Sequence, residues 1–257
     1  MNILVTGGCG FIGSHLVDQL KLNSDVANIR VLGKYNSSGG IGFLSKDIDL
    51  DVQLGDITDS SFVDKCMHDI DIVFNLAALI GIPYSYKNPD HVLHVNLFGT
   101  QNILNSALKN NAHVVQISTS EVYGTAQYEP INEDHPYHAQ SPYAASKVAA
   151  DQLCLSYYTS FDLPVCVLRP FNTFGPRQST RAIIPTIISQ LHRFQKLTLG
   201  SVEAYRDFTY VLDTVLGMIA TIKQISNSNL FNGLPTNLGT GKTIQIKEIA
   251  QKISSLM

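Results

Sequence analysis

Short apolar runs alternate with segments that are apolar on one side only through the first two thirds of the chain. The runs are nearly continuous in Val, Ile and Leu, which is typical of strands buried on both faces of a sheet. Strands are expected at residues 2–6, 29–32, 52–56, 71–77, 113–119 and 164–170. The segments between them have apolar residues at helical spacing over residues 11–21, 60–67, 91–109 and 143–161. This alternation predicts an α/β fold with a doubly wound parallel sheet covered by helices on both faces.

The pattern changes after Pro170. The stretch "FNTFGPRQSTRAIIPTII" is loop-like and then helical, and "LTLG", "RDFTYVLD" and "FNGLPTNLG" look like pieces of a smaller, substrate-covering region. We therefore expect a dinucleotide-binding domain that carries the catalytic residues over residues 1–170, and a substrate-binding region over 171–257 that is partly interleaved with the core. The last residues, "IQIKEIAQKISSLM", lie inside a helical pattern. The smaller lobe is therefore expected to be truncated at its C-terminal end.

Composition narrows the class of protein. The 257 residues are 44% hydrophobic and 15% charged, which fits a globular protein with a sizeable core. The net charge of −3, without a basic run, disfavours nucleic acid and anionic membranes as partners. No apolar run is long enough to span a bilayer, and the N-terminus lacks a signal peptide pattern. The four cysteines have neither metal-ligand nor disulfide spacing, so reduced thiols, no metal and a cytoplasmic location are expected.

A glycine loop, "VTGGCGFIGSHL", joins the first strand to the first helix. The absence of side chains at Gly7, Gly10 and Gly13 permits a tight turn and a close approach of a pyrophosphate. The helix that starts at Phe11 and Ile12 offers free N–H groups and the positive end of its dipole. Because a strand precedes the loop and a helix follows it, a Rossmann-type dinucleotide site is favoured over a ligand-free glycine turn.

The second strand ends without the acidic residue that often binds the adenosine ribose. Gly33 stands there, followed by Lys34. NAD is the expected cofactor, but NADP is not excluded, because Lys34 can meet a 2′-phosphate. Asp56, after the third strand, has two open interpretations: it accepts from the adenine amino group, or it caps the next helix.

Two motifs suggest a site at which protons move. In "SPYAASK", Tyr143 and Lys147 are four residues apart and share one face of a helix. An ammonium beside a phenol favours the phenolate, so the pKa of Tyr143 is expected to fall from about 10 toward neutrality. The phenolate can then accept a hydroxyl proton while hydride leaves the same carbon. In "STSEVYGT", Thr119 is placed to hydrogen-bond the reacting oxygen.

Taken in order, "TGGCGFIGSHL", "GDITD", "NLAA", "VNLFGTQNIL", "STSEVYG", "SPYAASK", "RPFNTFGPR" and "RDFTYVLD" resemble the extended short-chain dehydrogenases/reductases, in the NAD-dependent epimerase/dehydratase family. The resemblance covers nearly the whole chain. The stretches "NLAALIGIPYSYKNPDHVLHVNLFGT", "YNSSGG" and "FNTFGPRQSTRAIIPTII" are most similar to 4,6-dehydratases that process UDP- or GDP-N-acetylglucosamine toward deoxyamino and nonulosonic sugars. This implies a nucleotide-sugar substrate, tightly bound and recycled NAD, and a homodimer formed through helices near residues 90–109 and 143–161.

The resemblance also implies roles for the residues after the fifth strand. In the family's dehydratases, C4 is oxidised, a carboxylate at the position of Glu121 removes the C5 proton, water leaves from C6 and hydride returns there. The better-known dTDP-glucose dehydratases carry Thr-Asp-Glu, whereas this chain has Thr119, Ser120 and Glu121. Ser120 is a poor acid, so either Glu121 or a water at Ser120 must protonate the departing hydroxyl.

Binding residues follow from the same resemblance. The cofactor-binding set is Gly7, Gly10, Phe11, Ile12, Gly13, Lys34, Asp56, Ile57, Leu76, Ala77, Ala78, Asn96, Tyr143, Lys147 and Pro170. The substrate-binding set is Tyr84, Thr119, Asn172, Arg177, Arg181 and Arg206. Each also has a structural interpretation: a brace of the backbone for Asn96, a loop amide for Asn172, a half-buried core position for Tyr84 and surface ion pairs for the arginines.

Three other functions remain open. A UDP-glucuronate decarboxylase shares the Thr-Ser-Glu arrangement and the first oxidation. An NAD-dependent epimerase or a reductase would leave Glu121 without a role. A catalytically inactive cofactor-binding protein would not need Thr119, Glu121, Tyr143 and Lys147 together.

Overall fold

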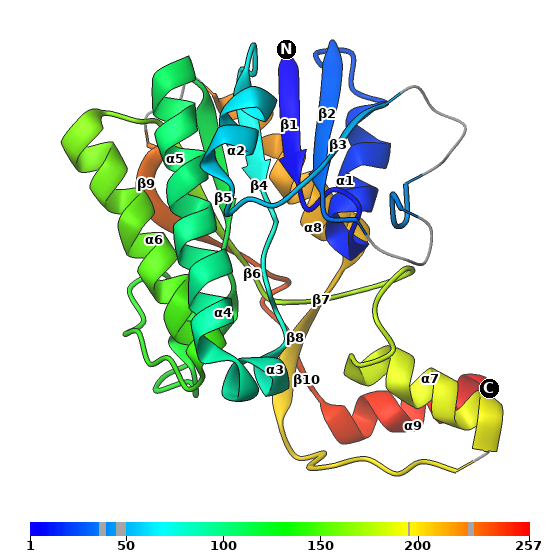
Figure 1. Ribbon diagram of the computed structural model, residues 1–257. Helices are drawn as coiled ribbons and strands as arrows, with labels where there is room; N and C mark the ends of the chain where they lie inside the picture. Colours follow the sequence, from blue (N-terminus) through cyan, green and yellow to red (C-terminus); the bar gives the residue numbers. More distant parts are fainter. Residues whose placement is uncertain (36–39, 45–49, 195, 226–228) are drawn as a thin grey trace.

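The computed structural model describes residues 1–35, 40–44, 50–194, 196–225 and 229–257. Most of the "YNSSGG" stretch singled out above therefore lies outside the described residues. The chain forms a central sheet with helices on both sides, and a smaller lobe beyond the carboxyl ends of the strands (Figure 1).

The central sheet has seven strands in the order β3-β2-β1-β4-β5-β6-β9, and every neighbouring pair is parallel. Their bounds are β1 Asn2–Thr6, β2 Asn28–Gly33, β3 Asp51–Leu54, β4 Ile72–Asn75, β5 His113–Ile117, β6 Val165–Pro170 and β9 Asn232–Leu238. The order reverses direction after β1, which is the doubly wound arrangement. The predicted α/β fold and its first six strands are confirmed.

Two helical layers cover the sheet because successive strand residues point to opposite faces. On one face, α1 (Phe11–Leu20) and α8 (Val211–Ala220) pack on a core that includes Ile3 and Val5. On the other face, Leu4 belongs to a second core with α2 (Ser60–Met67), α5 (Gly99–Asn110) and α6 (Pro142–Phe161). The run before α5 consists of α3 (Ile82–Lys87), α4 (Pro89–Leu93) and the π-helical turn η1 (His94–Phe98).

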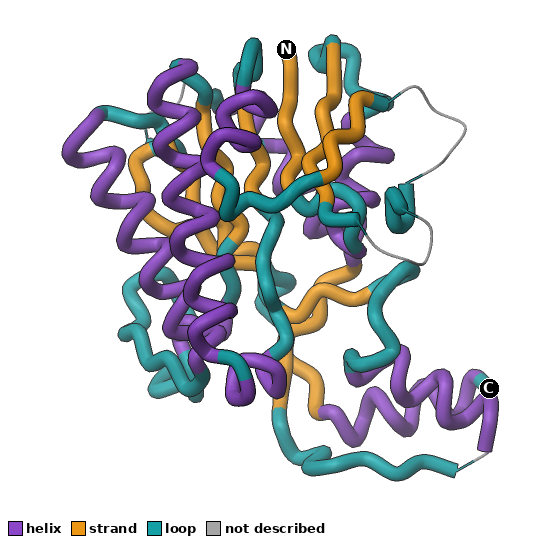
Figure 2. Tube along the Cα trace, viewed as in Figure 1, coloured by secondary structure: helices purple, strands orange, loops and turns teal. Residues whose placement is uncertain are grey.

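The smaller lobe has its own sheet and core. Its strands are β7 (Asn172–Phe174), β8 (Tyr205–Tyr210) and β10 (Thr243–Gln245), in the order β10-β8-β7. Its helices are α7 (Ile183–Phe194) and α9 (Ile246–Leu256), which pack together around Ile187 and Ile249. Figure 2 shows these two helices beyond the ends of the central strands. The lobe therefore lies on the side where ligands of doubly wound sheets bind.

The chain passes between the central sheet and the smaller lobe more often than a division at residue 170 would suggest. Leu197 and Leu199 of "LTLG" pack on the core of the smaller lobe. The assignment of "FNGLPTNLG" to that lobe is wrong, since residues 232–238 form β9 beside β6 in the central sheet. "RDFTYVLD" divides between β8 and the start of α8, which packs on α1. A short apolar strand does not reveal its pairing partner, so only the fold could place β9. The domain division at residue 170 stays a prediction.

A polar row crosses the sheet just below the candidate site. Thr6, Asn75 and Gln116 lie at the same level of β1, β4 and β5. Thr6 Oγ1 donates to Asn75 Oδ1 at 2.7 Å, and Asn75 Nδ2 donates to Gln116 Oε1 at 2.7 Å. All three are buried and mutually satisfied, so they hold the carboxyl ends of these strands in register.

Two general features bear on the sequence expectations. All four cysteines are free and buried. Within the described part of the chain, no helix has the length and apolar character needed to cross a bilayer.

The outer surface of the α4–α6 region carries the exposed side chains of Leu93, Phe98 and Phe161. Pairing of two copies through these helices stays a prediction.

Candidate active site

The glycine loop has the close packing that a dinucleotide-binding turn requires. Gly7 has φ +68°, and a Cβ there would lie 2.9 Å from the Ala77 nitrogen. A Cβ at Gly13 would overlap the Gly7 carbonyl oxygen. Gly10 begins α1 with an exposed, extended backbone, and no side chain caps the helix there. The first N–H groups of α1, from Phe11 onward, therefore face the loop free of side-chain partners, as a bound phosphate would need.

The end of β2 explains why no acidic residue stands at position 33. A Cβ on Gly33 would overlap Cys9 Sγ and lie 3.3 Å from Cys9 Cβ. Cys9 stands between Gly8 and Gly10 in the glycine loop, and its thiol is buried. The sulfur thus occupies the space that the first atoms of an Asp or Glu side chain would need.

We expect Gly33→Asp to destabilise the protein by about 1–3 kcal/mol, because the new Cβ meets a filled site. The double variant Cys9→Ala/Gly33→Asp should regain most of that loss, since only the 3.3 Å contact with the Cβ of residue 9 remains. Thermal unfolding of the wild type, both single variants and the double variant measures this coupling. Equal losses with and without Cys9 would show that the sulfur is not the obstacle.

Lys34 and Asp56 lie together next to this loop. Lys34 Nζ donates to Asp56 Oδ2 at 2.8 Å, and the other carboxylate oxygen accepts from the Thr58 nitrogen and hydroxyl. Burial raises the pKa of Asp56, but the hydrogen bonds from Lys34 and Thr58 outweigh it and lower the pKa to about 2. Asp59, not Asp56, caps α2. Of the two interpretations of Asp56, the helix cap is therefore wrong, and Lys34 is already paired with a carboxylate.

Thr119, Tyr143 and Lys147 meet at the carboxyl end of β5. Thr119 precedes the 3-10 turn η2 (Ser120–Tyr123) and caps it by accepting from the Glu121 nitrogen at 3.2 Å. Tyr143, in the first turn of α6, forms a hydrogen bond with Thr119. Lys147 follows one turn later and donates to the Ile117 carbonyl at 2.6 Å. Tyr143 and Lys147 are both buried.

The expected fall in the pKa of Tyr143 is wrong. Burial raises the pKa of Tyr143 to about 12, the hydrogen bond with Thr119 opposes this rise, and the charges of Glu121 and Asp151 add to it. The hydrogen bond of the Lys147 ammonium goes to the Ile117 carbonyl rather than to the phenol. The spacing of Tyr143 and Lys147 placed both on one helix face, but it did not reveal how deeply they are buried.

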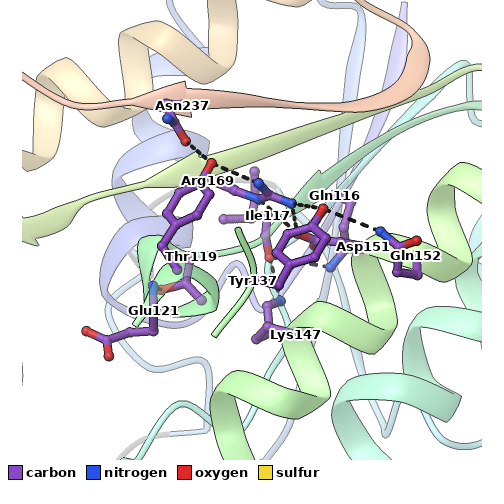
Figure 3. Close-up of polar contacts among 11 residues, drawn as sticks. Gln116, Ile117, Thr119, Glu121, Tyr137, Lys147, Asp151, Gln152, Arg169 and Asn237 are labelled. Atoms are coloured by element: carbon purple, nitrogen blue, oxygen red, sulfur yellow. Dashed lines mark hydrogen bonds and ion pairs between the residues drawn. The ribbon is translucent and has the colours of Figure 1, made fainter. Parts of the chain in front are cut away.

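Glu121 and Ser120 lie on η2 directly after Thr119, and both are half-buried. Figure 3 shows the Glu121 side chain pointing away from the polar cluster behind it. Among the described residues, none hydrogen-bonds its carboxylate. The carboxylate is close enough to Tyr143 to affect its ionisation. Glu121 is thus an available base beside the phenol.

The remaining predicted cofactor residues line the ends of neighbouring strands. Leu76, Ala77 and Ala78 follow β4, and the Ala77 nitrogen donates to Thr6 Oγ1 at 3.1 Å. Pro170 ends β6, and Ile57 is buried in the turn after β3.

Asn96, in η1, is also among the predicted cofactor residues. Its side chain accepts from the Leu79 nitrogen at 2.8 Å, donates to the Leu79 carbonyl, and donates to Ser146 of α6 at 2.9 Å. It is the brace that the sequence suggested.

The predicted substrate residues are more dispersed. Asn172 is half-buried in β7, and Arg181 is exposed before α7. Arg206 is exposed on β8, where it donates to the Tyr205 carbonyl. Arg177 instead ties its loop to α1, through an ion pair with Asp18 at 2.8 Å and a hydrogen bond to Ser14. Tyr84 is 39% exposed, and its hydroxyl hydrogen-bonds with His91.

The sequence interpretation missed a buried cluster behind the site. Arg169 of β6 is completely buried and binds Asp151 of α6 at 2.9 Å. Its guanidinium also donates to the hydroxyls of Tyr123 at 2.8 Å and Tyr137 at 2.6 Å (Figure 3). Tyr123 in turn donates to Asn237 of β9 at 2.7 Å. Two features of the sequence could have indicated this cluster: the charge of Arg169 inside an otherwise apolar strand, and the carboxylate of Asp151 four residues after Lys147.

Comparisons with known proteins agree on the family of this chain. A family model described as GDP-mannose 4,6 dehydratase matches residues 4–256. The chain is 33% identical over 98% of its length to the low-salt glycan biosynthesis protein Agl12 of Haloferax volcanii, and covers 81% of it. It is 35% identical over 85% of its length to a dTDP-glucose 4,6-dehydratase of Streptomyces antibioticus, and covers 67% of it. A UDP-N-acetyl-alpha-D-glucosaminuronate decarboxylase of Bacillus cytotoxicus is 33% identical over 98% of the chain, which covers 79% of that protein.

Solved structures agree. DesIV, a dTDP-glucose 4,6-dehydratase from Streptomyces venezuelae with NAD and TYD bound, superposes with a TM-score of 0.89 at 28% identity, over 99% of this chain and 80% of that one. TunA, an NAD-dependent NDP-hexosamine 5,6-dehydratase involved in tunicamycin biosynthesis, gives a TM-score of 0.86 at 27% identity, over 100% of this chain and 81% of that one. The likeness includes both the central sheet and the smaller lobe, since nearly the whole chain is covered.

Proposed function

The chain belongs to the GDP-mannose 4,6-dehydratase family of NAD-dependent epimerases and dehydratases, and from this premise we propose that it is a nucleotide-sugar 4,6-dehydratase. Its substrate is an NDP-N-acetylhexosamine, with UDP-N-acetylglucosamine favoured, and its product is the 4-keto-6-deoxy sugar nucleotide. Two of the similar proteins described above have an amino sugar in their names, a hexosamine and an N-acetylglucosaminuronate. The sequence resemblance points the same way.

The observation that supports dehydration best is the position of Glu121. Its backbone is fixed by the Thr119 hydroxyl, and its carboxylate lies beside Tyr143 without a hydrogen-bonding partner among the described residues. A half-buried carboxylate in this position can accept a carbon-bound proton after the neighbouring carbon is oxidised. Simple epimerisation at C4 has no use for such a base.

The cofactor is NAD, and the carboxyl ends of β1, β2 and β4 with the loops that follow them would hold it. The packed glycine turn and the uncapped start of α1 suit a pyrophosphate, and Asp56, which follows β3, would accept from an adenine amino group. When bound, NAD accepts a hydride from C4 of the sugar and returns it at C6, so that it is recycled. The ion pair between Lys34 and Asp56 favours NAD over NADP, because a 2′-phosphate would have to compete for Lys34.

The chain's own residues divide the proton transfers. The phenolate form of Tyr143 accepts the C4 hydroxyl proton as hydride leaves that carbon, and Thr119 orients the same oxygen. The Lys147 ammonium favours the developing phenolate. Glu121 then takes the C5 proton, which the 4-ketone has made acidic, and the C6 hydroxyl departs as water. Return of the hydride at C6 and uptake of a proton from solvent at C5 would complete the product.

Protonation of the departing hydroxyl is the step at which this chain differs from the Thr-Asp-Glu pattern. Ser120 has no acidic proton near neutral pH. Glu121, after it has taken the C5 proton, can pass it to the departing C6 hydroxyl. A water held at the Ser120 hydroxyl serves the same purpose.

Nucleotide binding falls to the smaller lobe. Arg206 and Arg181 are exposed and suited to a pyrophosphate, and Asn172 lies on β7, next to the strand that carries Arg206. Arg177 is a weaker candidate because Asp18 already pairs with it. Tyr84 would have to leave His91 to line a sugar pocket.

Product mass tests the proposal. The protein, with a catalytic amount of NAD, is incubated with UDP-N-acetylglucosamine, GDP-N-acetylglucosamine, dTDP-glucose or UDP-glucuronate. Loss of one water from an N-acetylglucosamine nucleotide, without net NADH, is the expected result. Loss of water only from dTDP-glucose would keep the dehydratase chemistry and overturn the substrate. Net NADH consumption or production would favour an oxidoreductase.

A decarboxylase is the second candidate. Loss of carbon dioxide from a 4-keto uronate needs no acid for a departing hydroxyl, so Ser120 in place of an Asp is compatible with it. The UDP-N-acetyl-alpha-D-glucosaminuronate decarboxylase of Bacillus cytotoxicus is as similar to this chain as Agl12 is. Loss of carbon dioxide from UDP-glucuronate in the same assay would establish this alternative.

A further inference from the structure

Three ionisable residues share one buried face of α6. Tyr143, Lys147 and Asp151 are spaced four residues apart, so they follow one another along the helix. Tyr143 is 7% exposed, and Lys147 and Asp151 are each 3% exposed. The proposed reaction uses the first two of them. Asp151 has no role in it, although a buried carboxylate is costly to place in a core.

Burial destabilises the charged form of Lys147, and the charge of Asp151 can offset this effect. A buried ammonium tends to lose its proton unless an opposite charge lies close to it. Lys147 has a strong hydrogen bond to the neutral carbonyl of Ile117, and burial lowers its pKa. The charge of Asp151 acts in the opposite direction. A neutral amine could not favour the Tyr143 phenolate.

Asp151 is held in its position by Arg169. Arg169 Nε donates to Asp151 Oδ2 at 2.9 Å, and the same oxygen forms the ion pair with Nη2. The rings of Tyr123 and Tyr137 both lie 4.9 Å from the centre of the guanidinium. The two tyrosine hydroxyls accept the remaining hydrogen bonds described above. The guanidinium is therefore fixed on several sides, and the carboxylate that it binds has one defined place.

We propose that Asp151 is a positioning residue of this enzyme, and that its carboxylate, anchored by Arg169, keeps the buried Lys147 in its charged form. Lys147, Asp151 and Arg169 thus form a row of charged groups: Asp151 binds Arg169 at 2.9 Å and lies one helical turn beyond Lys147. Arg169 cannot be deprotonated in proteins, so the row retains one fixed positive end. This deepens the proposed function, on which the catalytic role of Lys147 rests, but it does not depend on which sugar is bound.

The surroundings of the row contain few other ionisable groups. Burial raises the pKa of Asp151, while Arg169, the Ser118 hydroxyl and Lys147 oppose that rise. Among the described residues of α3, α4, η1, α5 and β9, none brings a charged group next to Lys147 or Asp151. The titratable groups that face the row come from α6, η2 and the loop before α6: Tyr143, Cys154, Glu121, Tyr123 and Tyr137. Of these, only Glu121 is a carboxylic acid, and it lies beside Tyr143.

The first test uses the protein without substrate. In protein labelled with ¹³C at lysine Cε, the Lys147 resonance is assigned by its absence from Lys147→Arg and followed against pH. We expect wild-type Lys147 to be charged at neutral pH. In Asp151→Asn, the pH at the midpoint of the Lys147 titration should fall by about one to three units, which is the effect of removing a nearby opposite charge. A neutral Lys147 in the wild type at pH 7 would overturn the proposal without any variant of Asp151.

Matched variants separate charge from packing. Asp151→Asn leaves Arg169 buried without its partner and can fail to fold. The double variant Asp151→Asn/Arg169→Gln removes both charges of the pair and should show the same fall in the Lys147 midpoint. Arg169→Gln keeps Asp151 opposite Lys147, so its midpoint should not fall even if its thermal stability does. Asp151→Glu should retain the wild-type midpoint.

The same variants make a prediction for turnover. If a sugar substrate is turned over, the alkaline limb of kcat should move to lower pH in the two variants that lack Asp151, and stay in place in Arg169→Gln. A purely structural Asp151 would instead make activity follow thermal stability in all variants, with no shift of the Lys147 midpoint. That result would overturn the proposal. Absence of turnover on every sugar tested would count against the proposed function alone, since the lysine titration needs no substrate.

Discussion

A Tyr143→Phe variant is expected to lose turnover by about 10²- to 10⁴-fold in kcat, the usual contribution of a positioned acid–base group. The phenol is the proposed acceptor of the C4 hydroxyl proton, and phenylalanine keeps the ring while it removes that oxygen. The fold should survive, because the lost interaction is the single hydrogen bond with Thr119. Single-turnover reduction of bound NAD by the sugar nucleotide is the measurement that isolates this step.

The control for this variant lies on the same helix. Tyr158 is half-buried near the other end of α6 and takes no part in the proposed chemistry. Tyr158→Phe should therefore leave kcat unchanged within about a factor of two, the ordinary range for a substitution away from the site. If Tyr143→Phe retained a kcat within tenfold of the wild type, the proton would have another acceptor.

The raised pKa of Tyr143 has a consequence for pH dependence. A phenol with a pKa of about 12 is almost entirely protonated at neutral pH, so the phenolate increases as pH rises toward that value. The wild-type-minus-Tyr143→Phe ultraviolet difference spectrum of the substrate-free protein should show no tyrosinate below about pH 10. Tyrosinate at neutral pH in that spectrum would show that Lys147 does lower the pKa of this phenol.

A Glu121→Gln variant should lose product formation by a comparable factor, about 10²- to 10⁴-fold, at a different step. Glutamine keeps the shape of the side chain but cannot accept the C5 proton. Oxidation at C4 depends on Thr119, Tyr143 and Lys147, so it should continue. Two measurements define the step: the rate of water loss by product mass, and incorporation of deuterium at C5 when the reaction runs in deuterated water. Both should fall together.

The matched control removes a carboxylate from a distant surface. Glu248 is exposed in the first turn of α9, and Glu248→Gln changes the net charge by the same amount. It should leave both rates unchanged. Water loss at the wild-type rate in Glu121→Gln would assign the base elsewhere. If the enzyme proves to be a decarboxylase, Glu121→Gln should have a much smaller effect, because carbon dioxide leaves without removal of a C5 proton.

The residues that form the candidate site could largely be found from the sequence. Glycines are required where backbone must approach a phosphate, so Gly7 and Gly13 mark the loop directly. A spacing of four residues on a helix brings Tyr143 and Lys147 to one face, whatever surrounds them. Thr119 and Glu121 follow a continuous apolar strand, and parallel strands end at a common edge. Each of these inferences uses local geometry, which a sequence carries in full.

Other features depend on contacts between distant segments. Arg169 and Asp151 are 18 positions apart and meet only because α6 packs over β6. Cys9 fills the space above Gly33 only because the glycine loop folds back over β2. Arg177 meets Asp18 across 159 positions, which turns a candidate phosphate ligand into an ion pair. Burial of Tyr143 shifted its pKa opposite to the direction that its neighbour in the sequence suggested.

The alternation of strands and helices, the glycine loop and the candidate catalytic pair Tyr143 and Lys147 could be inferred from the sequence, because they follow from periodicity and residue chemistry, and the family resemblance added Glu121. Packing between distant segments places β9 in the central sheet, fills the space next to Gly33 with the Cys9 sulfur, and brings Lys147 into a buried row with Asp151 and Arg169. The physical reason is that burial and pairing are properties of the packed chain. They set the energies of charges in the core, and no local pattern records them.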